Sequence, residues 1–534
     1  MMFFVIAAYI VCGVYMLLNF KSDLHMLQQN SYRISRYWRW LEHGNFLPAR
    51  KMVAIALIFL LMSTLLHPAL NVLIAAIASL VMCWPILTAK HKKPLVFTPR
   101  VRRIYSVSAL LALVAAVLTA VFCGMPGDKV GFYDGPAFTV SVMMLVTVVS
   151  PIIVIAAVWL LCPVEAHINR RYWNEAHDIL KSIPSLKVVG ITGSYGKTST
   201  KHYLHTILSE QFETLMTPGS YNTPMGVIRT VREMMKPYTQ VFICEMGAKQ
   251  KGDIKEICDL VDPACGIITA VGPMHLDTFG SIECVRDTKF ELADAIPPEG
   301  FVVVNNDFPQ VASREVRNTE CLCYAVNNTE EAAYRAEDIV YSPEGTTFTV
   351  VTPEGERIPF VSSLVGECNI SNLVAAIIVA MRLGMAADRI QLGVRRIQQV
   401  EHRLSVKRTP GGVTIIDDAF NSNPVGSKMA LEVLGTFKAS GRRICVTPGM
   451  IELGAEAEEL NEQLGRHIAR NADIAIIVNE VNRDPLVKGI LDEGFDKSQL
   501  HTVTDFAEAQ RLLSTLLRPD DTILYENDLP DSIR

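Results

Sequence analysis

Long apolar stretches dominate the first part of the chain. They cover residues 1–20, 52–66, 68–89, 104–125 and 137–162. A helix that crosses the hydrocarbon core of a bilayer, roughly 30 Å thick, needs about 20 apolar residues, and the last two stretches meet this length. His67 and Pro68 separate the second stretch from the third, which predicts a tight helical hairpin with a short first arm. We therefore expect a transmembrane domain of about five helices over residues 1–163.

The first apolar stretch is interpreted as a retained helix. It carries no charge before Lys21, and it lacks both the basic start and the small-residue cleavage site of a secretory signal. A four-span alternative, in which this helix lies in the membrane interface, leaves the location of the rest of the chain unchanged.

Basic residues in two of the loops predict the orientation. They are Lys21, Arg33, Arg36, Arg39, Arg50 and Lys51 in the first loop, and Lys90, Lys92, Lys93, Arg100, Arg102 and Arg103 in the second. The 126–136 loop carries only Lys129. The positive-inside rule then places both basic loops and everything after His167 in the cytoplasm, with the N-terminus outside.

Arginines and aromatic residues alternate in the segment 31–41 (SYRISRYWRWL). Such a segment suits a helix in the membrane interface. It could also grip the phosphates of a lipid-linked substrate. Alternatively, the basic loops only set the topology and bind anionic headgroups.

The bulk composition excludes some classes of protein. A net charge of −5 and a pI near 6.2 do not indicate a nucleic-acid-binding protein. The twelve cysteines include no CxxC pair, and most lie in apolar runs. They are typical of core thiols in a reducing cytosol rather than of a disulfide framework.

A phosphate-binding loop follows the apolar part. The β-branched run 187–192 (KVVGIT) leads into the loop 193–200 (GSYGKTST) and then into a helical pattern. Gly193 and Gly196 let backbone N–H groups turn toward phosphates, and the start of the helix adds its positive dipole end. Lys197 would neutralise the β- and γ-phosphates of ATP, and Thr198 would bind Mg²⁺. The alternative is a structural turn.

The spacing of this loop resembles that of the Mur ligase family. The form Thr-Gly-Ser-x-Gly-Lys-Thr-Ser-Thr places its two glycines closer together than the usual Gly-x-x-x-x-Gly-Lys loop does. The resemblance is strongest to the branch that adds D-alanyl-D-alanine to the cell-wall precursor. It implies that Gly193, Ser194, Gly196, Lys197, Thr198 and Ser199 contact the nucleotide, which would be ATP.

Further blocks follow in the family's order. The strand 241–245 ends in Glu245, which lies beside the phosphate loop if the sheet is parallel and can then reach a magnesium ion. Alone, it could equally cap the next helix. The resemblance implies that His275 binds a second Mg²⁺ and that Lys289 is carbamylated and binds the metals. Asp277 would support the site.

The last matching blocks contain further residues expected at the ATP site and the start of another domain. The resemblance implies that Asn369 packs against adenine, next to Cys368 where the family usually has His. It also implies that Arg403 contacts the γ-phosphate and that Asp418 binds the ribose. The catalytic set would be Lys197, Lys289, His275 and Arg403.

The domain organisation follows from these blocks. A helical membrane domain over 1–163 and a linker over 164–184 precede a central ATP-binding α/β domain over 185–405. A smaller Rossmann-like α/β domain over 406–534 ends the chain. From the apolar stretches and the basic loops, together with this resemblance, we expect a multi-pass protein of the bacterial inner membrane, with its catalytic domains in the cytoplasm.

Three departures from the family bear on the substrates. The membrane domain stands where cytosolic members hold a UDP-sugar. Gly449 stands where the dipeptide-adding branch has Asp, and the segment 525–531 (YENDLPD) is acidic where that branch is basic. A basic cradle suits the carboxylate of an incoming amino acid. An acidic one suits an amine whose carboxylate is absent or held elsewhere.

We therefore expect an ATP-dependent carboxylate–amine ligase that acts through an acyl phosphate on a cell-wall or surface-polymer precursor. The precursor is expected to be lipid-linked, because a lipid tail in the bilayer would hold the substrate near the site. The helices could instead only tether a ligase of soluble substrates. The alternatives are a poly-γ-glutamate or capsule-type synthase and a nucleotide-regulated membrane scaffold without catalysis.

Overall fold

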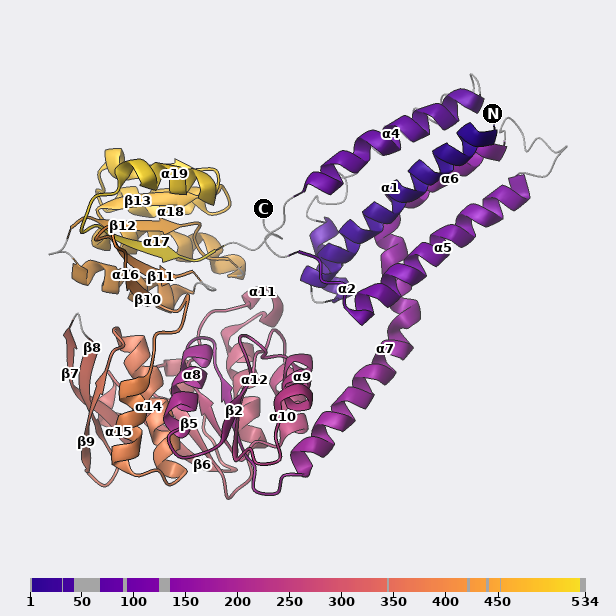
Figure 1. Cartoon of the computed structure of the whole chain (residues 1–534). Helices are drawn as coiled ribbons and strands as arrows, with labels where there is room; N and C mark the ends of the chain where they lie inside the picture. The colour runs from indigo at the N-terminus through magenta and orange to yellow at the C-terminus, as the bar shows by residue number, and fades with distance from the viewer. Residues whose placement is uncertain are drawn as a thin grey trace. The chain divides into compact units, whose positions relative to one another are not determined.

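The computed structural model describes residues 2–30, 32–42, 68–89, 94–123, 135–342, 345–419, 423–437, 441–451 and 453–528. The chain divides into two compact units, one over residues 1–170 and one over residues 171–529. Each is described by itself (Figure 1).

The first unit is helical. Its elements are α1 (Met2–Gln29), α2 (Ile34–Trp40), α4 (Pro68–Thr88), α5 (Pro99–Cys123), α6 (Gly135–Val148) and the start of α7 (Ser150–Lys181). Among the described residues, α1, α4, α5 and α7 are long and apolar enough to cross a membrane, whereas α6 is shorter. The predicted helix over 52–66 and most of the 126–136 loop lie outside the described residues.

One prediction for this part of the chain needs correction, and a second gains structural detail. The stretch 137–162 is not one helix but two, because Pro151 has no N–H to continue the α6 hydrogen bonds and disfavours the helical conformation of Ser150. The predicted linker 164–184 is mostly helical, because α7 continues to Lys181 and an Arg171–Glu175 ion pair supports its polar end.

A nine-stranded mixed sheet forms the first half of the second unit. Its strands are β1 (Lys187–Thr192), β2 (Thr214–Met216), β3 (Val241–Glu245), β4 (Cys265–Ile268), β5 (Phe301–Asn305), β6 (Glu320–Ala325), β7 (Tyr334–Ser342), β8 (Gly345–Val351) and β9 (Arg357–Ser362). The order is β2-β3-β1-β4-β5-β6-β7-β8-β9. Pairing is parallel from β2 to β7 and antiparallel from β7 to β9.

Helices cover both faces of this sheet. The core on one face includes side chains of α8 (Lys197–Leu208), α14 (Glu367–Arg382) and α15 (Ala387–Arg396). The core on the other face includes side chains of α9 (Pro224–Met234), α10 (Asp253–Val261) and α12 (Ile282–Ala295). The continuous apolar strands β1, β3 and β5 are central because both of their faces are buried.

A second, six-stranded sheet completes the unit. Its strands are β10 (Ser405–Arg408), β11 (Thr414–Asp418), β12 (Arg443–Thr447), β13 (Ile474–Val478), β14 (Leu500–Val503) and β15 (Thr522–Glu526). The order is β10-β11-β15-β12-β13-β14, and only β10 pairs antiparallel. The helices α16 (Pro424–Thr436), α17 (Ala457–Asn471) and α18 (Arg483–Asp492) cover one face, and α19 (Phe506–Leu516) covers the other.

The predicted fold class, a helical region followed by two α/β domains, is confirmed. The two sheets lie on either side of the predicted boundary at residue 405, although the boundaries themselves stay a prediction. In both sheets the loops that follow the parallel strands meet at one edge, which is where open α/β sheets bind ligands.

Candidate active site

The phosphate loop joins β1 to α8 in a conformation that needs glycine. Gly196 has a φ of 78°, and a side chain there would collide with the Asn372 amide. A side chain at Gly193 would collide with the hydroxyl of Thr269. The loop is also tied to the segment after β4, because the Ser194 backbone N–H donates to Ala270 O over 2.7 Å. The backbone therefore turns tightly at the start of α8, as a phosphate loop requires.

Lys197 lies folded over this loop. Its Nζ donates to the carbonyl oxygens of Gly193 and Ser194 over 2.6 and 3.0 Å. Burial lowers the pKa of Lys197 to about 8, against an opposing effect of Glu245 and with a smaller lowering effect of Arg403. The ammonium group is thus held at the loop, near both Glu245 and Arg403.

Glu245 is buried at the carboxyl end of β3, beside the loop. Its Oε1 accepts hydrogen bonds from Thr198 Oγ1 (3.2 Å) and Asn222 Nδ2 (3.0 Å). Its Oε2 lies 2.9 Å from Lys201 Nζ. Burial raises the pKa of Glu245, but Lys201 and Lys197 outweigh this effect, and the pKa lies below its ordinary value. The side chain is therefore a carboxylate.

Lys201 was not among the predicted site residues. A signal was nevertheless present, since Lys201 follows Lys197 by one helical turn and precedes Leu204 and Leu208 on the same face. A lysine on the buried face of an amphipathic helix needs a carboxylate partner.

Lys289 lies on the inner side of α12. It is only 3% exposed, and its Nζ is 5.9 Å from the centre of the Phe279 ring. Burial lowers the pKa of Lys289 to about 7, and the nearby Lys197 ammonium lowers it further. Lys289 and Lys197 therefore lie in the same electrostatic environment, although they come from different helices.

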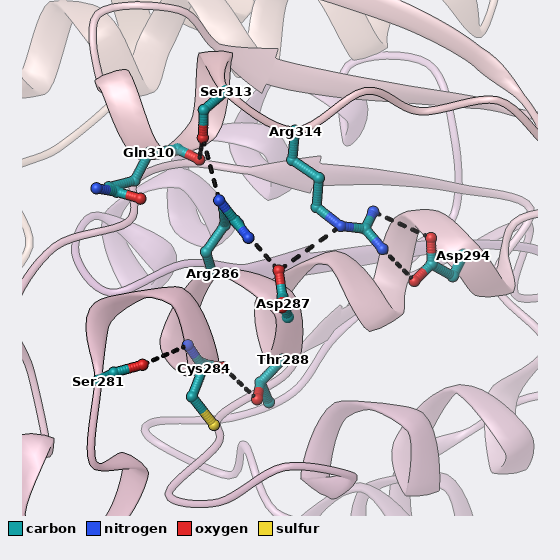
Figure 2. Close-up of polar contacts among 9 residues, drawn as sticks. All are labelled: Ser281, Cys284, Arg286, Asp287, Thr288, Asp294, Gln310, Ser313 and Arg314. Atoms are coloured by element: carbon teal, nitrogen blue, oxygen red, sulfur yellow. Dashed lines mark hydrogen bonds and ion pairs between the residues drawn. The ribbon is translucent and has the colours of Figure 1, made fainter.

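A surface network holds α12 from outside (Figure 2). Arg286 and Asp287 form an ion pair at 2.9 Å, and Arg314 bridges Asp294 at 2.8 Å and Asp287 at 3.9 Å. At the start of the helix, Ser281 Oγ accepts the backbone N–H of Cys284. The Arg314 contacts join α12, which carries Lys289, to the segment after β5.

His275 occupies a strained position at the start of α11 (Leu276–Phe279). Its φ is 54°, and its carbonyl oxygen accepts from both the N–H and the hydroxyl of Thr278. The side chain of Asp277 lies outside the described part of the structure.

The metal prediction can be compared with these donors. Within the described ranges, no three His, Cys, Asp or Glu side chains gather as a metal site. The Thr198 hydroxyl and the Glu245 carboxylate do share one point beside the phosphate loop. One carboxylate and one hydroxyl, completed by water and phosphate oxygens, suit Mg²⁺. The residues therefore fit one Mg²⁺, whereas a second ion would depend on His275 and a carbamylated Lys289.

Arg403 and Asp418 meet where the chain passes between the two sheets. Burial raises the pKa of Asp418 to about 6, against the opposing effects of Arg403 and of the Leu404 N–H, which donates to Asp418 Oδ1 over 3.0 Å. Burial lowers the pKa of Arg403. His402 and Leu404 both have positive φ values, 58° and 51°, so this short segment is strained on either side of Arg403.

Two other predicted nucleotide contacts have structural partners. Asn369 is buried on α14, where its Oδ1 accepts from Tyr203 OH over 2.7 Å and its Nδ2 donates to Val365 O over 2.8 Å. Ser199 is buried in the first turn of α8.

A cavity of about 540 Å³ opens next to these groups. Thr198 and His202 of α8, Ser220 of the following loop, and Gln399 and Arg403 contribute to its lining. Burial lowers the pKa of His202 to about 4, so this side chain is neutral at physiological pH. The cavity can hold a polar substrate between the phosphate loop and Arg403.

The six-stranded sheet carries acidic residues at its corresponding edge. Glu526 is fully buried at the end of β15 and accepts from Ser427 Oγ over 2.6 Å. Asn527 Nδ2 donates to Gly449 O over 2.6 Å. Gly449 has a φ of 79°, and a Cβ there would lie 2.6 Å from Asn461 Oδ1. An aspartate at position 449 would therefore be strained by the positive φ and would collide with the side chains of Asn461 and Asn482.

Comparison with known proteins agrees with this geometry. Residues 191–380 match the Mur ligase middle domain, and residues 402–525 match the Mur ligase glutamate ligase domain. A UDP-N-acetylmuramoyl-tripeptide–D-alanyl-D-alanine ligase of Mycobacterium bovis is 30% identical over 368 residues, which cover 64% of this chain and 70% of the relative. The Bacillus subtilis enzyme of the same name is 29% identical over 53% of this chain. The chain spans only 60% of the length of that relative.

Solved structures show the same similarity. The crystal structure of MurF from Acinetobacter baumannii superposes with a TM-score of 0.60 and 26% identity, covering 67% of this chain and 77% of the other. A MurF ligase from Thermotoga maritima, solved with ADP, shares the fold with a TM-score of 0.59 at 24% identity and covers 67% of this chain and 80% of the other.

Proposed function

Because the chain belongs to the Mur ligase family, we propose that it is a membrane-anchored ligase that uses ATP to join a carboxylate to an amine. One observation carries the proposal. Lys197, Glu245, Lys289, Arg403 and Asp418 come from separate elements, yet they are electrostatically coupled, and Arg403 also lines the cavity. Groups with shifted pKa values that gather beside a polar cavity are typical of catalytic sites.

The chemistry proceeds in two steps. An oxygen of the donor carboxylate attacks the γ-phosphorus of ATP, and ADP leaves. The acceptor amine then attacks the carbonyl carbon of the acyl phosphate, and phosphate leaves with that carboxylate oxygen while the amine loses a proton. Lys197 and Arg403 stabilise the charge that develops on the phosphoryl group, which is the main protein contribution to such transfers.

Magnesium would supply further charge neutralisation at the phosphates. Thr198 and Glu245 would hold one ion, and His275 with a carbamylated Lys289 would hold a second. A pKa near 7 keeps a large share of Lys289 uncharged at neutral pH, and only the uncharged amine can add CO₂. Carbamylation would turn this buried amine into an anionic ligand.

The membrane domain provides an argument about the substrate that donates the carboxylate. Arg103 and Arg100 at the start of α5 lie 2.6 and 3.8 Å from Glu165, and the Arg100 guanidinium lies 4.3 Å from the centre of the Tyr32 ring. Such a belt of arginines and aromatics suits the headgroup region of a membrane. We propose that the four apolar helices anchor the enzyme in the bacterial inner membrane and that the donor is a lipid-linked cell-wall or surface-polymer precursor.

The acidic edge of the second sheet provides an argument about the substrate that supplies the amine. Relatives are named for joining D-alanyl-D-alanine to a UDP-linked tripeptide. Here Glu526 ends β15 and Asp528 follows two residues later, and acidic side chains in this segment would repel a free carboxylate. We propose an acceptor whose amine is cationic in solution and whose carboxylate is absent or blocked.

The test uses the full-length protein in lipid nanodiscs with Mg²⁺ and ATP. The donor is UDP-N-acetylmuramoyl-tripeptide or its polyprenyl-diphosphate-linked form, and the acceptor is D-alanyl-D-alanine or its C-terminal amide. We expect ADP release that needs both substrates, with the lipid-linked donor and the amidated acceptor preferred. A fragment over residues 165–534 that used the UDP-linked donor as fast as the full chain would contradict the lipid-linked donor. ADP release with no need for any donor would contradict ligase activity.

A further inference from the structure

A buried ion pair joins the phosphate-loop helix to β3. Lys201 of α8 and Glu245 of β3 are 0% and 1% exposed, and their charged atoms are 2.9 Å apart. Lys201 Nζ also donates to the carbonyl oxygen of Gly219 over 2.5 Å. Charged side chains are rarely buried this deeply unless each has a partner. The pair therefore links α8, β3 and the loop that begins at Gly219.

The two oxygens of Glu245 have different surroundings. Lys201 Nζ donates a hydrogen bond to Oε2 over 2.9 Å. Oε1 faces Thr198 and Asn222, whose contacts are longer and come from uncharged groups. Thr198 also lines the cavity, so Oε1 lies on the side of the carboxylate nearer to it.

We propose that Lys201 is a positioning residue that fixes Glu245 so that only Oε1 is offered to the metal ion. The inference rests on the proposed role of Glu245 as a magnesium ligand. Lys201 balances the carboxylate charge when no metal is bound, and it prevents the carboxylate from binding a metal through both oxygens. A divalent ion then binds well only when nucleotide phosphates supply the remaining negative charge.

The same contact has a second consequence. Because Lys201 also donates to Gly219, a change in the Glu245 position would be transmitted to the loop that follows β2. That loop carries Ser220, which lines the cavity, and Asn222, which donates to Glu245. Lys201 thus joins the metal ligand and one cavity wall into a single unit.

The experiment measures Mn²⁺ binding by electron paramagnetic resonance, and thermal unfolding, on the full-length protein in detergent without nucleotide. Lys201→Met leaves Glu245 as a buried charge without its main counter-ion, and we expect its Tm to fall by roughly 10 °C. We expect Mn²⁺ to restore most of this loss, and its affinity to rise at least ~10-fold over that of the unsubstituted protein, because the cation that repels the metal is gone.

Two further variants make the result specific. Lys201→Met with Glu245→Gln removes both charges and should regain most of the lost Tm while losing the Mn²⁺ response. Arg442→Met is the matched control, since Arg442 pairs at 2.6 Å with Asp521, a carboxylate that is 2% exposed in the other domain. It should also lower the Tm, but Mn²⁺ should not restore it.

Equal Mn²⁺ binding with and without Lys201, an unchanged Tm for Lys201→Met, or Mn²⁺ rescue of Arg442→Met would overturn the proposal. None of these readouts depends on turnover. Metal-coupled stability without any ligase activity would support the role of Lys201 and count only against the proposed reaction.

Discussion

The two α/β domains carry opposite charges at equivalent edges. The nine-stranded sheet has the buried lysines Lys197, Lys201 and Lys289 around its ligand edge. The six-stranded sheet has Asp418 at the end of β11 and Glu526 at the end of β15. Both edges follow the carboxyl ends of parallel strands, so the fold provides the position and the side chains decide the ligand.

The pKa shifts of three charged groups at these edges oppose folding. Burial lowers the pKa values of Lys197 and Lys289 and raises that of Asp418. In each case the charged form is disfavoured in the folded protein, which costs free energy of folding. The proposed function assigns the cationic edge to the phosphates and the acidic edge to the amine. The following predictions test that division.

The largest effect is expected at the cationic edge. Lys197→Ala should lower kcat for donor-dependent ADP release by about 10³-fold, because a cation that stabilises the transferring phosphoryl group is lost. The control is Lys255→Ala, which removes an exposed lysine of α10 paired with Asp259 and should leave kcat unchanged. Unaltered turnover in Lys197→Ala would contradict the proposal that this edge binds the phosphates of ATP.

Lys289 tests whether one member of the cationic edge becomes an anion. Lys289→Ala should lower kcat by about 100-fold, the size of effect expected when a group supporting the metal is lost. A short carboxylic acid such as acetate should restore part of the activity by replacing the carbamate. Intact-protein mass spectrometry at neutral pH should show a CO₂ adduct in the unsubstituted protein. Full activity of Lys289→Ala without additive would make Lys289 a structural residue.

A substitution at Gly449 tests why the acidic edge carries no side chain at this position. Gly449→Ala should destabilise the protein by about 2 kcal/mol, because it combines a positive φ with collisions against Asn461 and Asn482. Gly355→Ala has a similar φ of 85° but open space around the new methyl group, and it should cost only about 1 kcal/mol. Chemical denaturation of both variants provides the measurement. Equal losses would mean that packing at the acidic edge does not exclude larger residues.

The smallest effect, taken per pH unit, concerns the titration of Lys289. In CO₂-free buffer, Lys289 loses its proton near pH 7 in the folded protein and near its ordinary pKa of 10.5 when unfolded. Between these values the unfolded state binds more protons, so Lys289 makes the free energy of unfolding rise by about 1.4 kcal/mol per pH unit. Subtracting the curve of Lys289→Met from that of the unsubstituted protein isolates this slope. A flat difference would show that Lys289 is not buried as a neutral amine.

Much of the fold was predictable because its signals are local. The β-branched strand, the glycine turn and the helix start at 187–200 predicted the phosphate loop, and the resemblance of the later blocks to the family predicted two α/β domains. The helix break at Val149 was missed because hydropathy does not report the backbone hydrogen bond that Pro151 cannot make. The roles of His275 and Lys289, and the span over 52–66, stay predictions.

The site was less predictable because it depends on pairing in space. Nothing near Glu245 in the sequence indicates that Lys201, 44 positions earlier, neutralises it. The absence of an aspartate at position 449 was noticed as a departure, but its reason, a positive φ enclosed by Asn461 and Asn482, needs the structure. Charge and burial together, rather than residue type alone, distinguish the two edges.

The central claim is that the cationic edge activates a donor carboxylate as an acyl phosphate for an amine bound at the acidic edge. The direct measurement labels the polyprenyl-linked donor described above with a heavy oxygen isotope in its terminal carboxylate and follows the label by mass spectrometry during turnover in nanodiscs. The account predicts that one labelled oxygen per turnover appears in inorganic phosphate and the other stays in the amide. Unlabelled phosphate released together with amide product would contradict it.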